Sequence, residues 1–338
     1  MKPTRPQLSA CLIVALATSG AATWAESGIA FVRKAESAES STAYVGTMRA
    51  VTLLEDGSHE SKLKVWADGR GRFRREYASG PAKGLVVLLT PDTSWRQEPG
   101  SDDWLELPGR KQDAPADSGL LGRNYDATNL RGEKVAGLAC RVIDLRAKHP
   151  GNPRKTLWVE IRTGLALRTD QYNSDGKLIS KSYFEELSLR RSEDASLFHP
   201  PTGQQTRTTP LTENLRPLDS AAQLARACGH RPDLPRDVPP GYELAGYFAR
   251  QCRRNVTLPA LRYFDGLNTL LVFEQAGGNG RRGWGRGRGW QFHGGRQDCQ
   301  FQESPQQKVV RYTDGKQSYL IVGDHNRDAL VKMAESIR

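Results

Sequence analysis

The fold class is decided by one stretch, residues 120–187, whose sequence is LLGRNYDATNLRGEKVAGLACRVIDLRAKHPGNPRKTLWVEIRTGLALRTDQYNSDGKLISKSYFEEL. Apolar and polar residues alternate over 142–146 and 157–162, and turns rich in Gly, Asn, Asp and Pro separate these runs. Such alternation, interrupted by such turns, is typical of antiparallel strands with one buried face. The stretch therefore predicts an antiparallel meander. It contains neither a catalytic dyad nor a metal-ligand spacing.

The chain before this stretch repeats the pattern. A helix is predicted over 26–42, where apolar residues fall near helical spacing. Short runs with strand character then lie at 44–54, 61–66, 72–77, 84–89, 94–97 and 104–107, separated mainly by Asp-Gly and Pro-Gly turns. Strands that follow one another in this way predict a large, curved antiparallel sheet.

The chain after the stretch changes composition. Prolines punctuate 198–240, which predicts a linker that holds one helix over 219–227. Strands are predicted beyond it, with a hairpin turn at Asp265-Gly266, and a closing helix covers 326–337 with Asp324 placed to cap it. The predicted fold class is α+β, with a large curved antiparallel sheet followed by a smaller α+β C-terminal domain.

The first 25 residues differ from the rest of the chain. Lys2 and Arg5 precede an apolar run over 8–17, and small residues lead to Ala25. These features predict a secretory signal peptide cleaved after Ala25. The run is shorter than the roughly 20 residues that a membrane-spanning helix needs. A lipoprotein box at Cys11 is the open alternative, although that residue precedes the end of the apolar run.

The net charge is positive and unevenly distributed. Loss of the signal peptide lowers it from +11 to +9. Residues 241–338 hold 15 Lys and Arg against 9 Asp and Glu, whereas residues 26–200 hold 27 against 25. Inside a cell this bias would suggest a nucleic-acid partner. In an exported chain it favours anionic lipid headgroups or an acidic protein partner, and export argues against nucleic acid.

Four cysteines remain in the mature chain: Cys140, Cys228, Cys252 and Cys299. In an oxidising compartment they indicate disulfides, with three possible connectivities. The favoured pair is Cys252–Cys299, which would close a loop inside the C-terminal domain. Zinc held by Cys228 and His230 is the rival interpretation, but no paired CxxC motif supports it.

Residues 277–290, GGNGRRGWGRGRGW, have the most unusual composition in the chain. Their G-x-G-x-x-G match lacks the surrounding βαβ unit and is a false positive for a nucleotide site. Two interpretations stay open, a flexible hairpin loop and a docking loop whose guanidinium groups pair with carboxylates or phosphates. The candidate partner-binding residues of the docking loop are Arg281, Arg282, Trp284, Arg286, Arg288 and Trp290.

The chain offers no pattern for catalysis. It lacks a Gly-x-Ser-x-Gly elbow, and His59-Glu60 lacks the second histidine of a zinc-protease helix. No Cys/His pair has an orienting partner nearby in the sequence. We therefore expect neither an enzyme nor a cofactor.

The ordered set of motifs resembles the MucB/RseB family, periplasmic regulators of an envelope-stress sigma factor. In the large domain the resemblance rests on Tyr44-Val45-Gly46-Thr47, Glu133–Gly137, Leu157-Trp158-Val159-Glu160 with Thr163-Gly164-Leu165, and Asp175-Gly176 with Phe184–Leu187. In the C-terminal part it rests on Pro239–Tyr242, Tyr263–Leu267 and Met333–Ile337. It spans nearly the whole mature chain. The cysteines and the 277–290 insert depart from the family pattern.

The resemblance implies an organisation and a function. The expected organisation is signal peptide 1–25, a LolA/LolB-like N-terminal domain 26–200, a Pro-rich linker 201–239 and a C-terminal domain 240–338. The implied function is that of a periplasmic protein which binds the periplasmic domain of a membrane-bound anti-sigma factor and releases it when lipid or lipopolysaccharide binds. A periplasmic lipid or lipoprotein carrier is the alternative.

The resemblance also implies an apolar cavity enclosed by a half-barrel over helices. The candidate lining residues are Val87, Leu89, Leu157, Val159, Ile161, Leu165 and Leu167, with Val86 and Leu88 as the alternative to Val87 and Leu89. The same residues would equally form the core of a filled sheet, since both structures need the same apolar face. The sequence leaves this choice open.

Overall fold

The structure, a computed structural model, describes residues 28–108, 119–190, 194–208, 215–251, 257–276, 299–304, 307–314 and 317–337. The predicted signal peptide lies outside these ranges. Within them, no helix combines the length and the apolar character needed to cross a bilayer.

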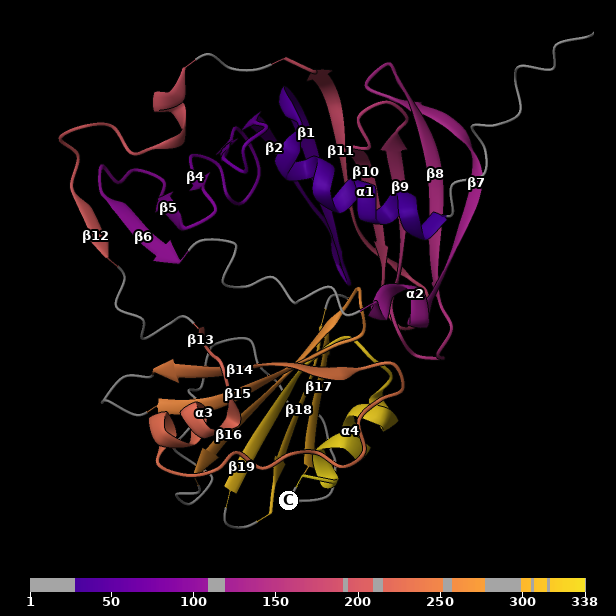
Figure 1. The fold of residues 1–338 in the computed structure, drawn as a ribbon, viewed down its shortest axis with the longest axis vertical. Helices are drawn as coiled ribbons and strands as arrows, with labels where there is room; N and C mark the ends of the chain where they lie inside the picture. The colour runs from indigo at the N-terminus through magenta and orange to yellow at the C-terminus, as the bar shows by residue number, and fades with distance from the viewer. Residues whose placement is uncertain are drawn as a thin grey trace, which may run out of the picture.

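The larger part of the chain forms a 12-stranded sheet, here called the first sheet (Figure 1). Its strand order is β12-β6-β5-β4-β3-β2-β1-β11-β10-β9-β8-β7. Its strands are β1 (Ala43–Leu54), β2 (Gly57–Asp68), β3 (Phe73–Tyr77), β4 (Val86–Leu89), β5 (Thr93–Gln97), β6 (Trp104–Pro108), β7 (Tyr125–Val135), β8 (Leu138–Ala147), β9 (Arg154–Glu160), β10 (Ala166–Tyr172), β11 (Leu178–Ser188) and β12 (Thr206–Thr208). Neighbouring strands are antiparallel except β12 and β6, which run parallel. The predicted curved antiparallel sheet is confirmed.

Two meanders, β1–β6 and β7–β11, make up the first sheet apart from its edge strand β12, and they join where β1 pairs with β11. The second meander is the 120–187 stretch. Its tight turns use glycine at positive φ, with Gly164 at 80° and Gly176 at 77°, a backbone conformation that glycine adopts at little cost. The turn chemistry therefore sets the strand order that alternation alone suggested.

Helix α1 (Gly28–Ser41) lies across the inner face of the curved sheet (Figure 1). Its buried side chains include Phe31, Val32 and Ala35, and they pack with Ile143 and Val159 of the sheet in one core cluster. Burying one apolar stripe of a helix in this way stabilises it far more than intrinsic propensity does. The helix predicted over 26–42 is thus α1.

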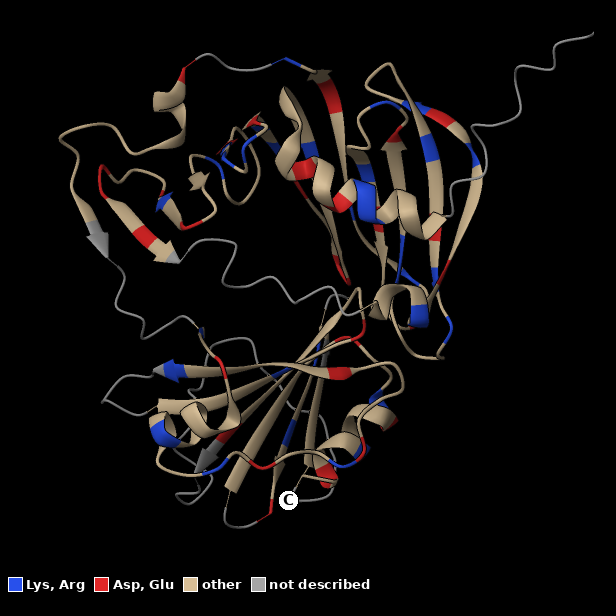
Figure 2. Cartoon of the chain, viewed as in Figure 1, with Lys and Arg blue, Asp and Glu red and all other residues tan. Residues whose placement is uncertain are grey.

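The second sheet has seven strands in the order β13-β14-β15-β16-β19-β18-β17. They are β13 (Leu215–Leu218), β14 (Glu243–Gln251), β15 (Thr257–Phe264), β16 (Thr269–Ala276), β17 (Cys299–Ser304), β18 (Gln307–Thr313) and β19 (Gln317–Gly323). Helices α3 (Ala221–Cys228) and α4 (Arg327–Glu335) pack on one face, where Leu224, Leu330 and Met333 are fully buried. Figure 2 shows few charged residues along these strands.

The cap of α4 differs from the prediction. Asn326 is the N-cap, and its side chain accepts a hydrogen bond from the Ala329 N–H at 2.8 Å. Asp324 instead accepts a hydrogen bond from the backbone N–H of Ser174, at 3.1 Å, in the other sheet's unit. The Asp324 carboxylate, which the sequence predicted as the helix cap, therefore serves in the contact between the two sheets instead.

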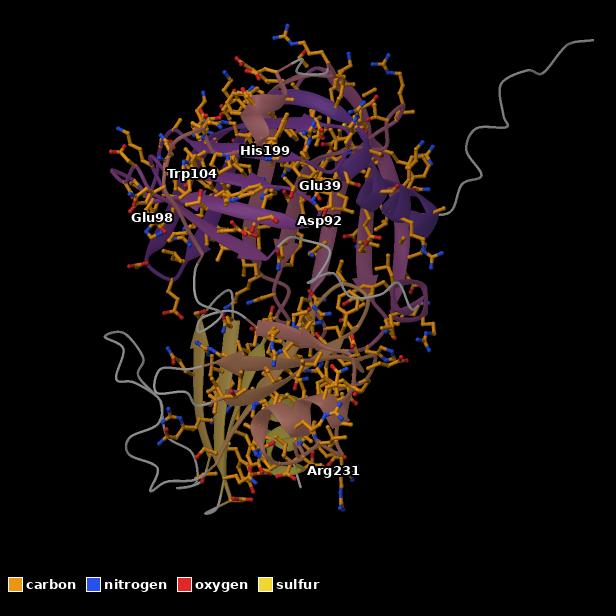
Figure 3. All side chains as sticks on the ribbon, turned by 60° about the vertical axis from the view of Figure 1, so that its left-hand side comes forward. Glu39, Asp92, Glu98, Trp104, His199 and Arg231 are labelled. Carbon is orange, nitrogen blue, oxygen red and sulfur yellow. The ribbon has the colours of Figure 1, made fainter. Side chains whose placement is uncertain are left out.

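The segment predicted as a linker contributes to both sheets. The single turn η2 (Ala195–Phe198) precedes it, and His199 packs edge-on against Trp95 with ring centroids 5.6 Å apart. Trp104 of β6 is buried and donates a hydrogen bond to Gln204 Oε1 (2.5 Å), which holds the chain beside the first sheet (Figure 3). β13 and α3 then belong to the second sheet. The domain boundaries themselves stay a prediction.

Candidate functional site

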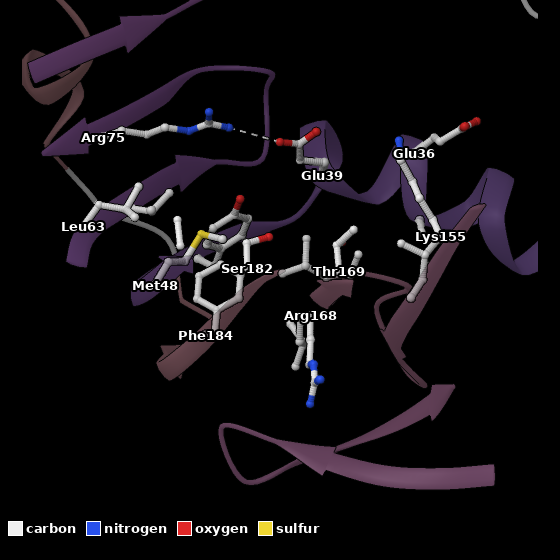
Figure 4. A pocket seen from close by; sticks show the side chains of 18 of the residues that line it. Glu36, Glu39, Met48, Leu63, Arg75, Lys155, Arg168, Thr169, Ser182 and Phe184 are labelled. Atoms are coloured by element: carbon white, nitrogen blue, oxygen red, sulfur yellow. Dashed lines mark hydrogen bonds and ion pairs between the residues drawn. The ribbon is translucent and has the colours of Figure 1, made fainter. Parts of the chain in front are cut away.

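A cavity of about 510 Å³ lies between α1 and the inner face of the first sheet (Figure 4). Its wall is largely apolar. Strands β1, β2 and β11 contribute Met48, Leu63 and Phe184, and α1 contributes Val32 and Ala35. Aliphatic and aromatic walls of this kind favour an apolar occupant, since it loses water contact on entering.

Charged side chains also line the cavity, at positions on α1, β3, β9 and β10. An Arg75 Nη2 lies 3.3 Å from Glu39 Oε1 and links β3 to α1 (Figure 4). Arg168 points away from the other labelled side chains, and its guanidinium pairs with Asp170 at 2.6 Å. Lys155 lies beside Glu36 of α1. Burial lowers the pKa of Lys155, while the charges of Asp265 and Glu36 oppose that shift.

The structure brings only some of the predicted cavity residues to this wall. Leu157, Leu165 and Leu167 line the cavity. Val159 is fully buried and packs in the cluster beneath α1, so it belongs to filled core. Ile161 lies in the β9–β10 turn and is 47% exposed.

The two candidates on β4 lie elsewhere. Val87 is half-buried and pairs with Arg75 on one side and Arg96 on the other. Leu89 packs against the core cluster that contains Phe73 and Phe184. Neither residue lines the cavity. The assignment of a cavity ligand to any of the predicted residues stays a prediction.

Sequence reasoning missed the walls that β1, β2 and β11 supply. Met48 and Ala50 on β1, with Ser182 and Phe184 on β11, face the cavity because β1 pairs with β11. That pairing joins residues 128 to 143 positions apart, for example Arg49 with Tyr183. The available signal was the alternation in 44–54, which marked a buried face without identifying its neighbour.

The remaining predicted sites lie wholly or partly outside the residues that the structure describes. The partner-binding candidates Arg281, Arg282, Trp284, Arg286, Arg288 and Trp290 lie outside the described residues. So does Cys252. Cys299 is a buried free thiol, as is Cys140, and Cys228 is a half-buried one, so the Cys252–Cys299 disulfide stays a prediction.

The part of the chain that the structure describes brings together no three His, Cys, Asp or Glu side chains that could hold a metal ion. His230 lies 2.8 Å from Glu274 Oε1 through its Nε2, and its Nδ1 lies 3.2 Å from the Cys228 carbonyl. Burial raises the pKa of Glu274, an effect that hydrogen bonding and the neighbouring histidine partly offset. This pair joins the segment after α3 to β16.

The two sheets meet through a buried polar contact centred on Asp265, in the β15–β16 turn. Asp265 is fully buried. Its Oδ1 accepts hydrogen bonds from the backbone N–H groups of Leu267 (2.8 Å) and Asn268 (2.6 Å). Its Oδ2 accepts from the Tyr125 hydroxyl (2.5 Å) and the Asn152 side-chain amide (2.9 Å) of the first sheet's unit. One carboxylate therefore orders the turn and joins the units.

Further hydrogen bonds extend this contact. Asn124, at the end of helix α2 (Leu120–Asn124), donates to the carbonyls of Gly241 (2.7 Å) and Asp265 (2.9 Å). His325 Nε2 lies 2.9 Å from Asn152 Oδ1. Burial lowers the pKa of His325. The neutral ring therefore donates from Nε2, since an amide oxygen only accepts.

A second polar contact joins the β10–β11 turn to β18 and to the segment between β19 and α4. Lys308 is 3% exposed, and its Nζ donates to Ser174 Oγ at 2.7 Å. The same ammonium lies 3.4 Å from Asp175 and 3.9 Å from Asp324. Burial raises the pKa of Asp324, while Ser174 and Lys308 oppose that shift. The two contacts fix how the sheets face each other.

The fold and the cavity define a class: two-unit α+β proteins whose larger unit is a curved antiparallel sheet with a cavity beneath a helix. Residues 95–208 match the model of the MucB/RseB N-terminal domain. This part of the chain therefore carries a MucB/RseB N-terminal domain, as the motifs predicted.

Solved structures show the same architecture. The Pseudomonas aeruginosa MucA/MucB complex matches with a TM-score of 0.63 at 20% identity, over 92% of this chain and 98% of that chain. A crystal structure of MucB in complex with MucA(peri) matches with a TM-score of 0.58 at 20% identity, over the same shares. A crystal structure of MucB alone matches with a TM-score of 0.54 at 19% identity, over 92% and 97%. At these identities the likeness establishes the fold. None of the curated proteins matches the chain.

Proposed function

We propose that this protein is a periplasmic regulator of an envelope-stress sigma factor that binds the periplasmic part of a membrane-bound anti-sigma factor. The observation that carries the proposal is the match to MucB in its complex with MucA, which extends over 92% of this chain and 98% of that one. The fold of nearly the whole chain is therefore shared with a protein that was solved in complex with MucA(peri). The MucB/RseB domain at 95–208 supports the same function.

The proposal assigns the cavity to a lipidic signal, such as lipid or lipopolysaccharide. Its wall carries Leu63, Leu165, Leu167 and Phe184, with Met48 as an adaptable side chain among them. Each buried methylene of an acyl chain contributes about 0.8 kcal/mol. Roughly ten buried methylenes would thus supply about 8 kcal/mol, equivalent to micromolar affinity.

The regulatory step follows from linkage. A lipid releases the anti-sigma factor only if it binds more tightly to the partner-free protein than to the complex. The partner must then weaken lipid binding by the same factor by which lipid weakens partner binding. This reciprocity gives the proposal a quantitative test in both directions.

The test is titration calorimetry of the mature chain with the periplasmic segment of the anti-sigma factor encoded in the same genome. We expect saturable binding with a Kd in the micromolar range or tighter. Binding should weaken when lipopolysaccharide is added, and a segment of the same length and charge with a scrambled sequence is the matched control. Absence of specific binding would refute the regulator function.

A periplasmic lipid or lipoprotein carrier is the second candidate, and the cavity itself favours it. A carrier should co-purify with lipid or lipoprotein from the periplasm and transfer it to acceptor vesicles. Mass spectrometry of material extracted from the purified protein separates the two functions. A carrier should contain bound lipid or lipoprotein and does not require an anti-sigma factor.

A further inference from the structure

The cavity beneath α1 is completed by a side chain from the other unit. Of the described residues that line it, Leu267 alone comes from the second sheet's unit; the others lie between Val32 and Phe184. Leu267 is half-buried, and it packs against the cluster that contains Phe31 and Val159. An occupant of this end of the cavity would therefore contact both units.

The turn that carries Leu267 is held firmly. Its backbone N–H donates to Asp265 Oδ1 at 2.8 Å, and Asp265 Oδ2 is bound by Tyr125 and Asn152. A Cβ on Gly266 would lie 2.3 Å from the backbone nitrogen of Leu121 in α2. The turn is thus closely packed against α2, and Leu267 lies in the cavity wall only while the turn stays docked on the first sheet's unit.

Charged groups also lie near the end of the cavity that Leu267 lines. Lys155 lines the cavity, and the Asp265 carboxylate acts on it across the contact. Leu157, on the same strand, belongs both to the cavity wall and to the cluster that Leu267 joins. The docked turn therefore contributes an apolar contact and a nearby negative charge to one end of the cavity.

We propose that occupation of the cavity by an apolar chain and docking of the two units are positively coupled, with Leu267 as the coupling side chain. A ligand shifts a protein toward the arrangement with which it makes more contacts. Only the docked arrangement places Leu267 against the ligand, so the ligand stabilises that arrangement. This coupling rests on the proposed function in one respect: the ligand of the cavity is apolar.

The expected size of the coupling follows from the side chain. Leu267→Ala removes three carbons, only part of which face the cavity. The variant should therefore bind an acyl probe about three- to tenfold more weakly. By reciprocity, saturating probe should favour docking by the same factor.

The experiment uses the mature chain and cis-parinaric acid, an acyl probe that fluoresces in apolar surroundings. Docking is read at a site remote from the cavity. The backbone N–H of Ser174 donates to Asp324 Oδ2 (3.1 Å) across the second contact, so its hydrogen exchange slows when the units are docked. We expect saturating probe to slow exchange at Ser174 about three- to tenfold in the wild-type protein.

Two variants make the test specific. In Leu267→Ala the probe should still bind but leave exchange at Ser174 unchanged. Met48→Ala is the matched control, because Met48 is a half-buried cavity residue on β1. It should weaken probe binding yet retain the slowing at saturation. Circular dichroism and exchange without probe check that each variant folds and docks.

The outcomes separate the two proposals. Probe binding without slower exchange at Ser174 would overturn the coupling and leave the lipid site standing, and so would full slowing in Leu267→Ala. Absence of probe binding to the wild-type protein would overturn the apolar ligand of the proposed function and this inference together. Slowing in the wild type and in Met48→Ala, with none in Leu267→Ala, is the result that the coupling requires.

Discussion

Replacing Asp265 with alanine should destabilise the contact between the two units more than any surface substitution. The change removes the acceptor for Tyr125 and Asn152, whose donors lie 2.5 Å and 2.9 Å from Oδ2, and for two backbone N–H groups of the turn. A hydrogen bond to a charged group contributes about 1.5–3 kcal/mol, and a buried donor left unpaired costs about 1–3 kcal/mol. The Tyr125 hydroxyl can turn to the Pro153 carbonyl at 3.3 Å, which recovers part of the loss.

The expected loss is about 4 kcal/mol in the free energy of unfolding, or roughly 10 °C in Tm. Urea unfolding followed by circular dichroism, together with hydrogen exchange at Leu267 and Asn268, measures it. Asp265→Asn should give an intermediate loss. Its carbonyl oxygen can still accept from the turn, but its amide group then faces the donor of Asn152.

Asp126→Ala is the matched control. That side chain is 71% exposed and lies 3.6 Å from Lys148, so its loss should change stability by no more than about 0.5 kcal/mol. If Asp265→Ala unfolds within about 1 kcal/mol of the wild type, the carboxylate does not hold the two units together and the argument is wrong.

Three further changes test the charges at the contacts and in the insert. Burial lowers the pKa of His325 below its ordinary 6.5. As pH falls through 6.5, the unfolded chain therefore takes up the proton first, and the free energy of unfolding decreases. His325→Gln should reduce this decrease, as measured by urea unfolding at a series of pH values. Lys308→Met leaves Asp324 and Asp175 without their ammonium and should cost about 2–4 kcal/mol in the same assay. From the sequence alone, serine at four insert positions should weaken anti-sigma binding at low salt, with little effect at high salt; these positions are Arg281, Arg282, Arg286 and Arg288.

Each of these changes has a control or a refuting result. Lys332→Met removes a 72% exposed lysine 3.7 Å from Asp237 and should be nearly neutral. Equal losses in Lys332→Met and Lys308→Met would contradict the role of the buried ammonium. The pH dependence is read as the difference between the wild type and His325→Gln at each pH, because burial also raises the pKa of Asp324, whose proton uptake stabilises the folded state as pH falls. Equal pH dependence of the two proteins would contradict the role of His325. An unchanged affinity of the serine variant at low salt would end the docking-loop interpretation.

Alternation and turn residues were sufficient to predict most of the first sheet. Strand order within each meander follows from hairpins between neighbours, which Gly164 and Gly176 specify locally. The β1–β11 pairing could not be predicted, because no local signal links strands so far apart in sequence. The family resemblance, and not periodicity, supplied the expectation of a half-barrel.

The cavity residues show where the sequence stops being informative. Leu157 and Val159 fall on one face by period-two alternation and both pack with the cluster that contains Phe31, yet of the two only Leu157 also borders the cavity. The position of α1 decides between them. A register shift between Ala166 and Arg168 also breaks the alternation beside Leu167. Filled and empty parts of one sheet face need the same residue types, so only tertiary packing separates them.

In the sequence, Leu267 follows a predicted hairpin turn and ends the Tyr263–Leu267 motif of the family resemblance, and neither feature indicated a cavity. Its place in the cavity wall depends on the docking of two sheets through Asp265, whose partners Tyr125 and Asn152 are more than 110 residues away. A buried carboxylate that satisfies donors from both units is a tertiary feature. Neither composition nor spacing could have indicated it.

The most direct test of the account is calorimetry of the mature chain with the periplasmic segment of its anti-sigma factor, with and without lipopolysaccharide. The account predicts a Kd in the micromolar range or tighter, weakened about tenfold or more by saturating lipopolysaccharide. No binding of the segment, together with lipoprotein that co-purifies with the protein, would contradict the regulator and favour the carrier.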